Sequence, residues 1–492
     1  WDFEPVAGQV YHISEIDQDF GTYERFLNQN IHPSSNITSG QVYLTVLLRE
    51  REGVHYLGKT IQIIPHITNE IKRRIREIER RENPDVLIVE IGGTVGDIEA
   101  MPFLEAIRQF RLEEPEENTL SIHVTLVPFL EVVGEFKSKP TQHSVRALQA
   151  AGLQPNVVVC RSTKSLPEIV RRKVSLYSNI PYEAVISSPD IEVIYELPII
   201  YEKQGLGEYL INQLRMNVRE SKYQDWQELV DHFKNPKEII NIALPGKYID
   251  IRDSYVSINE SLKHASMKCG VKVNIEWLDT EEFEKNPGQI PMILNGFDGI
   301  LLTPGFGTRG VEGMIMSAIY ALKNKVPYLG ICFGAQLLFI AFCREMLGLS
   351  GANTTEVNPK TPYPVVDLLP EQKAIKDKGG TMRLGGHSVY VEPNTLLYEA
   401  YQKNRIVERF RHRFHIIPKY AHQAEEKGLV ISGWDETGKI INAIEYNKNG
   451  NWMVGTQFHP EYKSHPLAPS PIYWIFIQKA LEYRNQQKRE TI

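Results

Sequence analysis

The sequence predicts an α/β fold with two doubly wound parallel-sheet domains. Two series of short apolar runs, each typical of a buried strand, alternate with helical stretches along the 492 residues. A chain of this length favours two or three domains. Hydrophobic residues make up 42% and charged residues 24%, as in ordinary globular proteins. The formal charge of -6 argues against a nucleic-acid-binding protein as a class.

The first series extends to about residue 215. Apolar runs at 86–91, 122–128 and 157–160 predict buried parallel strands, and residues 103–111 predict a helix between them. A basic stretch at 67–81 predicts an amphipathic helix with a solvated charged face, because four isoleucines recur on its other side: Ile67, Ile71, Ile75 and Ile78.

The second series follows a polar, helix-like stretch. We expect domains at 1–215 and 237–492, joined by a linker at 216–236 that contains no buried strand. Apolar runs that predict strands of the second domain lie at 239–244, 299–302, 327–331 and 453–458.

The cysteines indicate a reducing, cytoplasmic setting. Four cysteines in so long a chain are not a disulfide framework, and none pair with the spacing of metal ligands. No apolar run approaches the ~20 residues of a membrane span, and no signal peptide is recognisable. The chain begins Trp1-Asp2-Phe3 without methionine, so we expect N-terminal residues to be missing. The cysteines are Cys160, Cys269, Cys332 and Cys343.

Cys332 is the strongest candidate nucleophile. It is the centre of Gly-Ile-Cys-Phe-Gly at 330–334, between an apolar strand and a helix-like stretch. The glycines allow a sharp strand-to-helix turn that exposes the side chain. The helix N-terminus favours thiolate, and Phe333 can offer its backbone N–H to an oxyanion.

Two further motifs supply the other parts of a cysteine amidase. In Phe-His-Pro-Glu at 458–461, His459 and Glu461 stand two residues apart, so on an extended segment they point to the same face as base and orienting group. The turn at 303–307 follows an apolar strand. Because Pro304 has no N–H, only Gly305 can donate from it to a carbonyl oxygen.

The stretch at 53–60 fits the P-loop expression but not its context. A working P-loop follows a strand and begins a helix, whose N–H groups hold the phosphate. Here a charged stretch precedes it, and an extended stretch ending at Pro65 follows it. We therefore expect no phosphate site at these residues.

The glycine turn, the elbow and His-Pro-Glu together resemble class I (triad-type) glutamine amidotransferases. Beyond them, nearly the whole chain resembles the CTP synthase family, for example in Glu-Ile-Gly-Gly-Thr-Val-Gly-Asp-Ile-Glu at 90–99. The other stretches that carry this likeness are 21–26, 65–68, 137–144, 305–313, 379–385 and 411–414.

The resemblance implies a fold and a reaction. The N-terminal domain is expected to be a P-loop-NTPase-like synthetase domain whose own phosphate loop precedes Trp1. Glutamine is hydrolysed at Cys332 through a thioester, and the ammonia passes inside the protein to the synthetase domain. There ATP phosphorylates O4 of UTP, and ammonia displaces the phosphate to give CTP. The family also implies GTP as an activator, CTP as a product inhibitor, and a homotetramer that can form filaments, without nucleic-acid or membrane partners.

The resemblance also assigns site residues. Glutamine contacts fall on Gly305, Phe333, Gln336, Glu356 and Arg413, with Glu356 suited to the substrate ammonium. Magnesium falls on Asp19 and Glu90, since Mg²⁺ prefers carboxylate oxygens. Nucleotide contacts fall on Asp19, Asp97, Ile98, Glu99, Lys137, Lys139, Gln142, Gly205 and Leu206.

Two alternatives to CTP synthesis stay open at this stage. One is a bare glutaminase or a paralogue that aminates another nucleotide. The other is a catalytically weak subunit that serves as a scaffold in oligomers or filaments. Glutamate release and CTP formation from ammonia distinguish these alternatives from the leading hypothesis.

Overall fold

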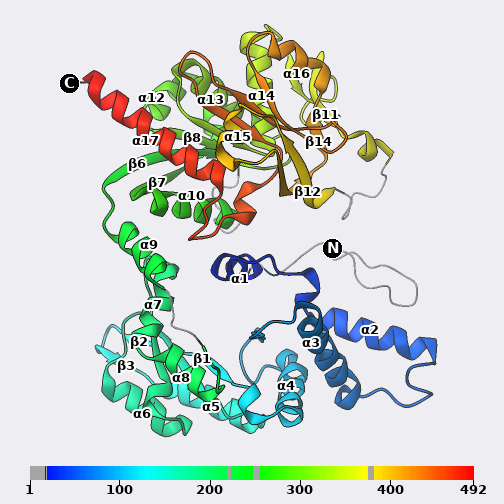
Figure 1. The fold of residues 1–492 in the computed structure, drawn as a ribbon, viewed down its shortest axis with the longest axis vertical. Coiled ribbons are helices and arrows are strands. Elements are labelled where there is room, and N and C mark those ends of the chain that lie inside the picture. Colours follow the sequence, from blue (N-terminus) through cyan, green and yellow to red (C-terminus); the bar gives the residue numbers. More distant parts are fainter. Residues whose placement is uncertain (1–16, 18, 219–222, 248–254, 375–381, 492) are drawn as a thin grey trace. The chain divides into compact units, whose positions relative to one another are not determined.

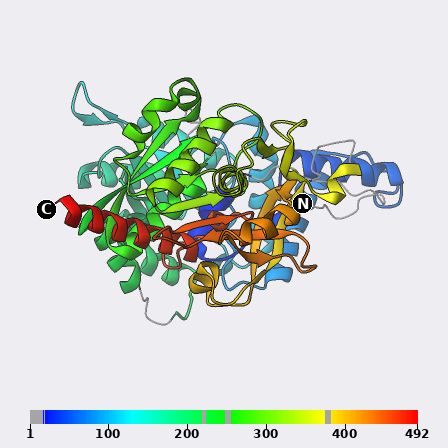
Figure 2. The ribbon, with the colours of Figure 1, turned by 90° about the horizontal axis from the view of Figure 1, so that it is seen from above.

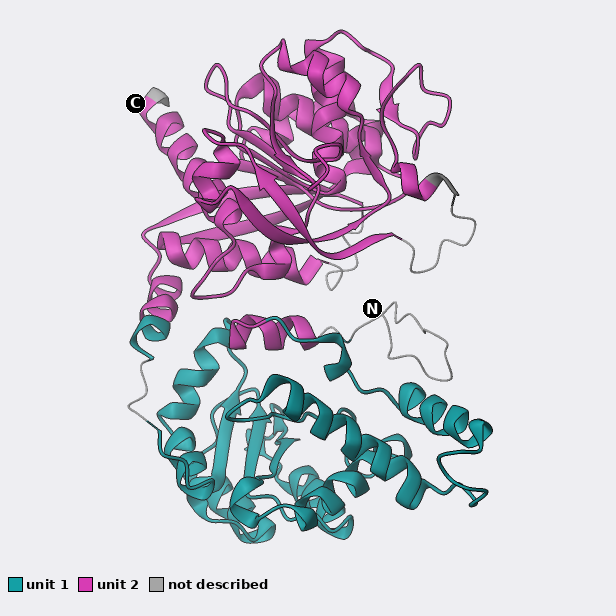
Figure 3. Cartoon of the chain, turned by 45° about the vertical axis from the view of Figure 1, so that its right-hand side comes forward, with its two compact units in different colours: residues 1–17, 30–227 teal, residues 18–29, 228–492 magenta. Residues whose placement is uncertain are grey.

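The computed structural model describes residues 17, 19–218, 223–247, 255–374 and 382–491. The chain divides into two compact units, each described by itself below (Figure 3). Unit 1 comprises residues 1–17 and 30–227, and unit 2 comprises residues 18–29 and 228–492. Residues 1–16, the linker positions 219–222, and positions 379–381 of the 379–385 stretch lie outside the described residues.

Unit 1 is built on a three-stranded parallel sheet in the order β1-β4-β5 (Figure 1). Val145, Val157 and Ile186 are fully buried in its core. The strands are β1 (Ile122–Leu126), β4 (Val157–Ser162) and β5 (Val185–Pro189), beside a hairpin of β2 (Phe129–Leu130) and β3 (Glu135–Phe136). The helices are α2 (Ser39–Glu52), α3 (Thr68–Glu82), α4 (Met101–Glu113), α5 (Lys139–Ala150), α6 (Glu168–Ser178), α7 (Leu197–Glu202) and α8 (Leu206–Gln213).

The expected amphipathic helix is α3. Its isoleucine side packs with Val42 and Val46 of α2 and with Ala106 of α4 in a separate small core. Its charged side carries ion pairs, such as those of Glu70 with Arg49, Arg73 and Arg74. Glu79 and Arg80 are exposed but Glu70 and Lys72 are buried, so the solvated charged face predicted from the sequence is confirmed only in part.

The buried strand expected at 86–91 is absent. This segment pairs with no described strand, and Ile88 is 77% exposed. An apolar run states a preference for burial, but a strand also needs a neighbour for its backbone N–H and C=O groups. No described strand provides that neighbour here.

Unit 2 contains a nine-stranded sheet in the order β13-β12-β15-β16-β17-β9-β8-β6-β7. The five strands from β7 to β17 run parallel, and the remaining four continue antiparallel. In sequence order they are β6 (Glu238–Gly246), β7 (Val271–Asp279), β8 (Gly299–Leu302), β9 (Tyr328–Ile331), β12 (Arg383–Val391), β13 (Arg405–His412), β15 (Val430–Trp434), β16 (Ile441–Tyr446) and β17 (Met453–Thr456).

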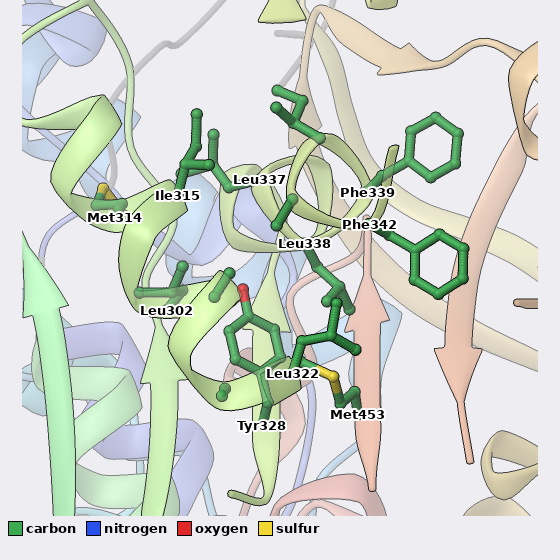
Figure 4. Packing of buried hydrophobic residues seen from close by; sticks show 14 of the residues in the cluster. Leu302, Met314, Ile315, Leu322, Tyr328, Leu337, Leu338, Phe339, Phe342 and Met453 are labelled. Carbon is green, nitrogen blue, oxygen red and sulfur yellow. The ribbon is translucent and has the colours of Figure 1, made fainter. Parts of the chain in front are cut away.

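Helices cover both faces of this sheet, as a doubly wound fold requires. On one face, α13 (Val311–Asn324) and α14 (Phe333–Met346) bury Ile315, Leu337 and Phe342 (Figure 4). On the other, α10 (Val256–Cys269) and the long C-terminal helix α17 (Pro471–Thr491; red in Figure 2) bury Leu262 and Phe476.

The remaining elements of unit 2 are smaller. A three-stranded sheet contains β10 (Ala352–Thr354), β11 (Tyr363–Leu368) and β14 (Phe414–Ile416). The further helices are α1 (Asp19–Leu27), α11 (Thr280–Lys285), α12 (Ile290–Leu294), α15 (Leu396–Tyr401) and α16 (Pro418–Glu425), while α9 (Gln224–Lys234) spans the boundary between the units. None of the described helices combines the length and apolar character needed to cross a bilayer.

The P-loop look-alike at 53–60 has the wrong neighbours. Gly53 ends helix α2 with a left-handed φ of 72°, so a helix precedes the stretch instead of a strand. Residues 57–62 form no helix. The expectation that this stretch is not a P-loop is confirmed.

Candidate active site

Cys332 occupies the turn between β9 and α14. Its φ is 52° and its ψ is -99°, a conformation that L residues rarely adopt and that is found at strained functional turns. A Cβ at Gly330 would lie 2.6 Å from the Gly334 carbonyl carbon, and one at Gly334 would lie 2.3 Å from the Leu302 oxygen. The two glycines are therefore required by close backbone approach, as the elbow motif predicts.

The Cys332 side chain is held in a buried pocket of polar atoms. Only 4% of the residue is exposed. Its backbone N–H donates to the Thr456 carbonyl at 2.6 Å, which fixes the turn to strand β17. The Gln457 amide Nε2 lies 3.4 Å from Sγ, and the Arg411 carbonyl oxygen lies 3.7 Å from it. The Cys332 sulfur therefore accepts from an amide N–H and donates to a carbonyl oxygen.

His459 and Glu461 form a buried hydrogen-bonded pair at the end of β17. His459 Nδ1 lies 2.8 Å from Glu461 Oε1, and their side chains are 3% and 2% exposed. We had expected an extended segment here, and that expectation is wrong. Pro460 begins a 3-10 helix (Pro460–Lys463), and this turn brings Glu461 back to the imidazole.

The backbone and a neighbouring ring hold His459 in place. Its N–H donates to the Arg409 carbonyl at 2.8 Å, and the Tyr462 ring stacks on the imidazole at 5.0 Å with an interplanar angle of 11°. Burial alone disfavours imidazolium, but the charges of Glu461 and Cys332 outweigh it and raise the pKa of His459 well above its ordinary value. The site therefore stabilises the protonated form of His459.

The expected oxyanion donors follow two neighbouring strands. Gly305 follows β8 and Phe333 follows β9, and Leu302 is paired with Gly330 where these two strands end. Past Gly305 the chain turns at Gly307, whose φ is 81°. The Gly307 N–H donates to Glu356 Oε1 at 2.9 Å.

The remaining residues expected at the glutamine site are placed as follows. Gln336 donates from Nε2 to the Phe414 carbonyl at 2.9 Å and to Gln457 Oε1 at 3.0 Å, so Gln457 connects it to Cys332. The buried Oε1 of Gln336 has no hydrogen-bond partner among the described residues. Arg413 lies on the connection between β13 and β14, and its guanidinium donates to Gln372 Oε1 at 2.7 Å.

The residues expected at the synthetase site are distributed along unit 1, apart from Asp19. Glu90 is exposed on the unpaired 86–91 segment, and Asp97 precedes a 3-10 helix (Ile98–Ala100) that also contains Glu99. Ile98 is 86% exposed. Asp19 is the first residue of α1, which belongs to unit 2.

The lysines and glycine expected at the nucleotide site have clear local roles. Lys137 forms an ion pair with Glu135 at 2.7 Å, and Lys139 opens helix α5. Gln142 on that helix donates to Ser138 Oγ at 3.0 Å. Gly205, with a φ of 82°, precedes α8, whose first residue is the buried Leu206.

Two family models match the chain. The model for the CTP synthase N-terminus matches residues 6–216, and the model for class I glutamine amidotransferases matches residues 250–479. A CTP synthase of Pyrococcus abyssi is 49% identical over 483 residues, which cover 98% of this chain and 89% of that protein. One from Archaeoglobus fulgidus is 47% identical over 484 residues, covering 98% and 90%.

The chain belongs to the CTP synthase family. CTP synthases make CTP from UTP, with ATP and with glutamine as the nitrogen donor. The family, the fold class and the enzyme activity expected from the sequence are therefore confirmed. A solved Trypanosoma brucei CTPS glutaminase domain with bound acivicin is 33% identical, with a TM-score of 0.47, and covers 49% of this chain and 94% of that one. Neither alternative activity gains support from these relatives.

Sequence reasoning missed two residues of the site. Gln457 lies beside the recognised His459, and its place after an apolar strand could have singled it out. Lys247 directly follows β6 and contacts the turn after β8. The rule that ligands bind at the carboxyl ends of parallel strands pointed to both positions.

Proposed function

We propose that unit 2 of this CTP synthase hydrolyses glutamine with Cys332 as nucleophile, His459 as acid and base, and Glu461 as the group that orients His459. The observation that carries the proposal is the pairing of β9 with β17, Ile331 opposite Thr456. Cys332 directly follows Ile331, and the buried His459–Glu461 pair begins three residues after Thr456, which supports a cysteine turn close to that pair. Nucleophile, base and orienting carboxylate in this order form a cysteine triad.

The chemistry follows from these groups. The Cys332 thiolate attacks the amide carbon of glutamine, and the N–H groups of Phe333 and Gly305 stabilise the oxyanion. His459 gives its proton to the departing nitrogen, which leaves as ammonia. A thioester remains, and His459 then takes a proton from the water that hydrolyses it to glutamate. The raised pKa of His459 suits the first of these proton transfers.

We propose that Glu356 and Arg413 bind the α-ammonium and α-carboxylate groups of glutamine, and that Gln336 forms a hydrogen bond with the substrate. Glu356 offers a carboxylate to the ammonium, and Arg413 a guanidinium to the carboxylate. The unpartnered Oε1 of Gln336, buried beside the site, supports a role in binding an N–H of the substrate.

We further propose that the N-terminal domain, residues 1–215, binds ATP and UTP, and that the linker at 216–236 joins it to the amidotransferase domain at 237–492. Lys137, Lys139 and Gln142 suit a triphosphate, while Asp97, Ile98, Glu99, Gly205 and Leu206 suit the nucleosides. From family membership we propose Asp19 and Glu90 each as a contact of Mg²⁺, because this ion prefers carboxylate oxygens. When bound, the metal neutralises phosphate charge. GTP activation, CTP inhibition, a homotetramer and a cytoplasmic setting are proposed from family membership.

Glutamate release from glutamine tests the triad. Cys332→Ala and His459→Gln are expected to abolish release, and Glu461→Gln to lower its kcat by about 10²- to 10⁴-fold. Cys269→Ala is the matched control, because this cysteine also lies in unit 2 but burial raises its pKa to about 11 and keeps it a thiol. Full activity in Cys332→Ala, or a comparable loss in Cys269→Ala, would contradict the assignment.

A further inference from the structure

Lys247 is a buried lysine that touches both walls of the candidate oxyanion site. Only 5% of the residue is exposed. Its Nζ donates to the Phe306 carbonyl at 3.2 Å and to the Gly307 carbonyl at 2.6 Å. The same ammonium group lies over the Phe333 ring, 4.6 Å from its centroid. One charged group therefore contacts the turn after β8 and the residue that follows Cys332.

These contacts fix a particular peptide group. The peptide between Phe306 and Gly307 has its C=O bound to Lys247 and its N–H bound to Glu356. A peptide held at both ends cannot rotate, and Gly305 is the residue directly before it. At Gly305 itself a Cβ would meet nothing within 4 Å, and the peptide that carries its N–H accepts, through the Pro304 carbonyl, a long hydrogen bond of 3.5 Å from the Tyr255 hydroxyl.

We propose that Lys247 is the positioning residue of the oxyanion site: it holds the 305–307 turn and Phe333 so that their N–H groups meet the tetrahedral intermediate. The inference rests on the proposed function of Cys332 in glutamine hydrolysis. It assigns Lys247 no contact with substrate. Its effect is transmitted through two carbonyl groups and one aromatic ring, and it acts on the transition state, where oxyanion donors matter most.

Simple space filling does not account for a lysine at this position. Burying an ammonium group is costly, and a methionine would fill the same space without that cost. Burial lowers the pKa of Lys247 to about 8. The negative charges of Glu356 and Glu284 oppose this shift, and the nearby positive charge of Arg309 adds to it. Arg309 also donates to the Lys247 carbonyl at 2.9 Å, which anchors the backbone.

The position predicts opposite pH dependences for activity and stability. Activity needs the ammonium form, so glutamine hydrolysis falls as pH rises through about 8. Stability moves the other way. Between about pH 8 and the ordinary lysine value of 10.5, the unfolded chain binds more protons than the folded one, so the Lys247 contribution to stability rises with pH. A residue with only a structural role would not produce this fall in glutamine hydrolysis at alkaline pH, which we call the activity limb.

The experiment compares Lys247→Met and Lys247→Arg with the wild type in the full chain. Glutamate release gives kcat and KM, and alkylation of Cys332 by iodoacetamide reports the thiolate without requiring an oxyanion. We expect Lys247→Met to lower kcat about 10- to 100-fold, less than direct loss of an oxyanion donor, with KM and the alkylation rate within about threefold of wild type. Lys247→Arg should restore kcat and remove the activity limb near pH 8, because arginine stays charged.

Each other outcome overturns the proposal. A kcat for Lys247→Met within threefold of wild type shows that the ammonium is dispensable. A parallel fall in the alkylation rate shows that the cysteine itself is disturbed. If Lys247→Met does not fold, the Lys247→Arg profile decides, and an unchanged alkaline limb overturns the proposal. Absence of Cys332-dependent glutamate release in the wild type would instead refute the proposed function.

Discussion

At the scale of single residues, the elbow depends on glycines that no other residue can replace. Gly330→Ala would place a Cβ 2.6 Å from backbone atoms of Gly334, which cannot move without shifting α14. We expect a loss of about 1–3 kcal/mol in the free energy of unfolding and a fall in glutamine-dependent kcat. Melting temperatures and glutamate release measure both effects.

The matched control for that substitution is Gly288→Ala. A Cβ at Gly288 meets nothing within 4 Å, and the residue lies in a short 3-10 helix (Pro287–Gln289) of the same unit. It should change neither the melting temperature nor the activity. Equal effects at Gly288 and Gly330 would show that the close approach in the elbow has no special importance.

A buried carboxylate on β13 gives a second residue-scale prediction. Burial raises the pKa of Glu408 from 4.5 to about 7. Between these values the folded chain binds more protons than the unfolded one, so this group's contribution to stability is present below about pH 4.5 and is lost as pH rises to about 7. The full effect is about 3 kcal/mol.

Glu408→Gln removes this dependence. We expect the melting temperature of the variant, relative to wild type, to increase between pH 4.5 and pH 8. Other titrating groups cancel in the difference. A relative melting temperature that stays constant across this range would rule out a protonated Glu408 in the folded state.

The sequence singles out the motif residues of the candidate site more readily than the residues that support them. Cys332 stands out because glycines flank it in the elbow motif, and His459 and Glu461 stand out because they are two residues apart in a second motif. Lys247 and Gln457 join the site only through the order of strands in the sheet. A single sequence states which strands exist more clearly than which of them are neighbours.

At the scale of elements, prediction succeeded where a strand lies inside the parallel sheet. The runs at 299–302 and 453–458 correspond to β8 and β17, buried on both faces between neighbours. The equally apolar run at 86–91 forms no strand among the described residues. All three runs are apolar, so their composition does not explain the difference. What differs is whether a neighbouring strand is present to pair with the run.

A bidentate ion pair joins helix α1 to strand β13 within unit 2. Arg409 binds Glu24 of α1 through both of its Nη atoms, at 2.7 and 2.8 Å, and also donates to the Tyr462 carbonyl at 3.4 Å. The Glu24 side chain is 10% exposed and that of Arg409 27%. The arrangement connects α1 to the residue whose ring stacks on His459.

Arg409→Met is expected to loosen α1. It leaves a nearly buried carboxylate without its bidentate partner, at a cost of about 1–3 kcal/mol, below that of a fully buried pair because Arg409 is partly exposed. Hydrogen exchange of the α1 amides should accelerate, and the charge exchange Glu24→Arg with Arg409→Glu should recover part of the protection. Unchanged exchange in Arg409→Met would show that other contacts hold α1.

At the scale of the whole molecule, the chain combines two chemistries in two compact units. The family models divide the chain in a similar way, since one matches residues 6–216 and the other residues 250–479, but residues 18–29 of the first match belong to unit 2. Cys332 and its partners lie wholly in unit 2, whereas Lys137 and Glu90 lie in unit 1. On the proposed function, ammonia is the only product of glutamine hydrolysis that CTP formation requires.

Cys332→Ala is therefore expected to separate the two reactions. In the full chain it should form no CTP from UTP, ATP and glutamine, yet form CTP at about the wild-type rate when ammonia is supplied directly. The substitution removes the nucleophile and leaves the N-terminal site untouched. CTP formation and glutamate release, measured in the same reaction, check the result.

Glu90→Gln provides the opposite case. It removes one of the two carboxylates proposed for Mg²⁺, so CTP formation should fall with either nitrogen source while Cys332 still hydrolyses glutamine. The two variants together test the division of labour, because each should spare the reaction that the other abolishes. Loss of ammonia-driven synthesis in Cys332→Ala would mean that the two units do not act as separable sites, and that the cysteine turn also supports the synthetase reaction.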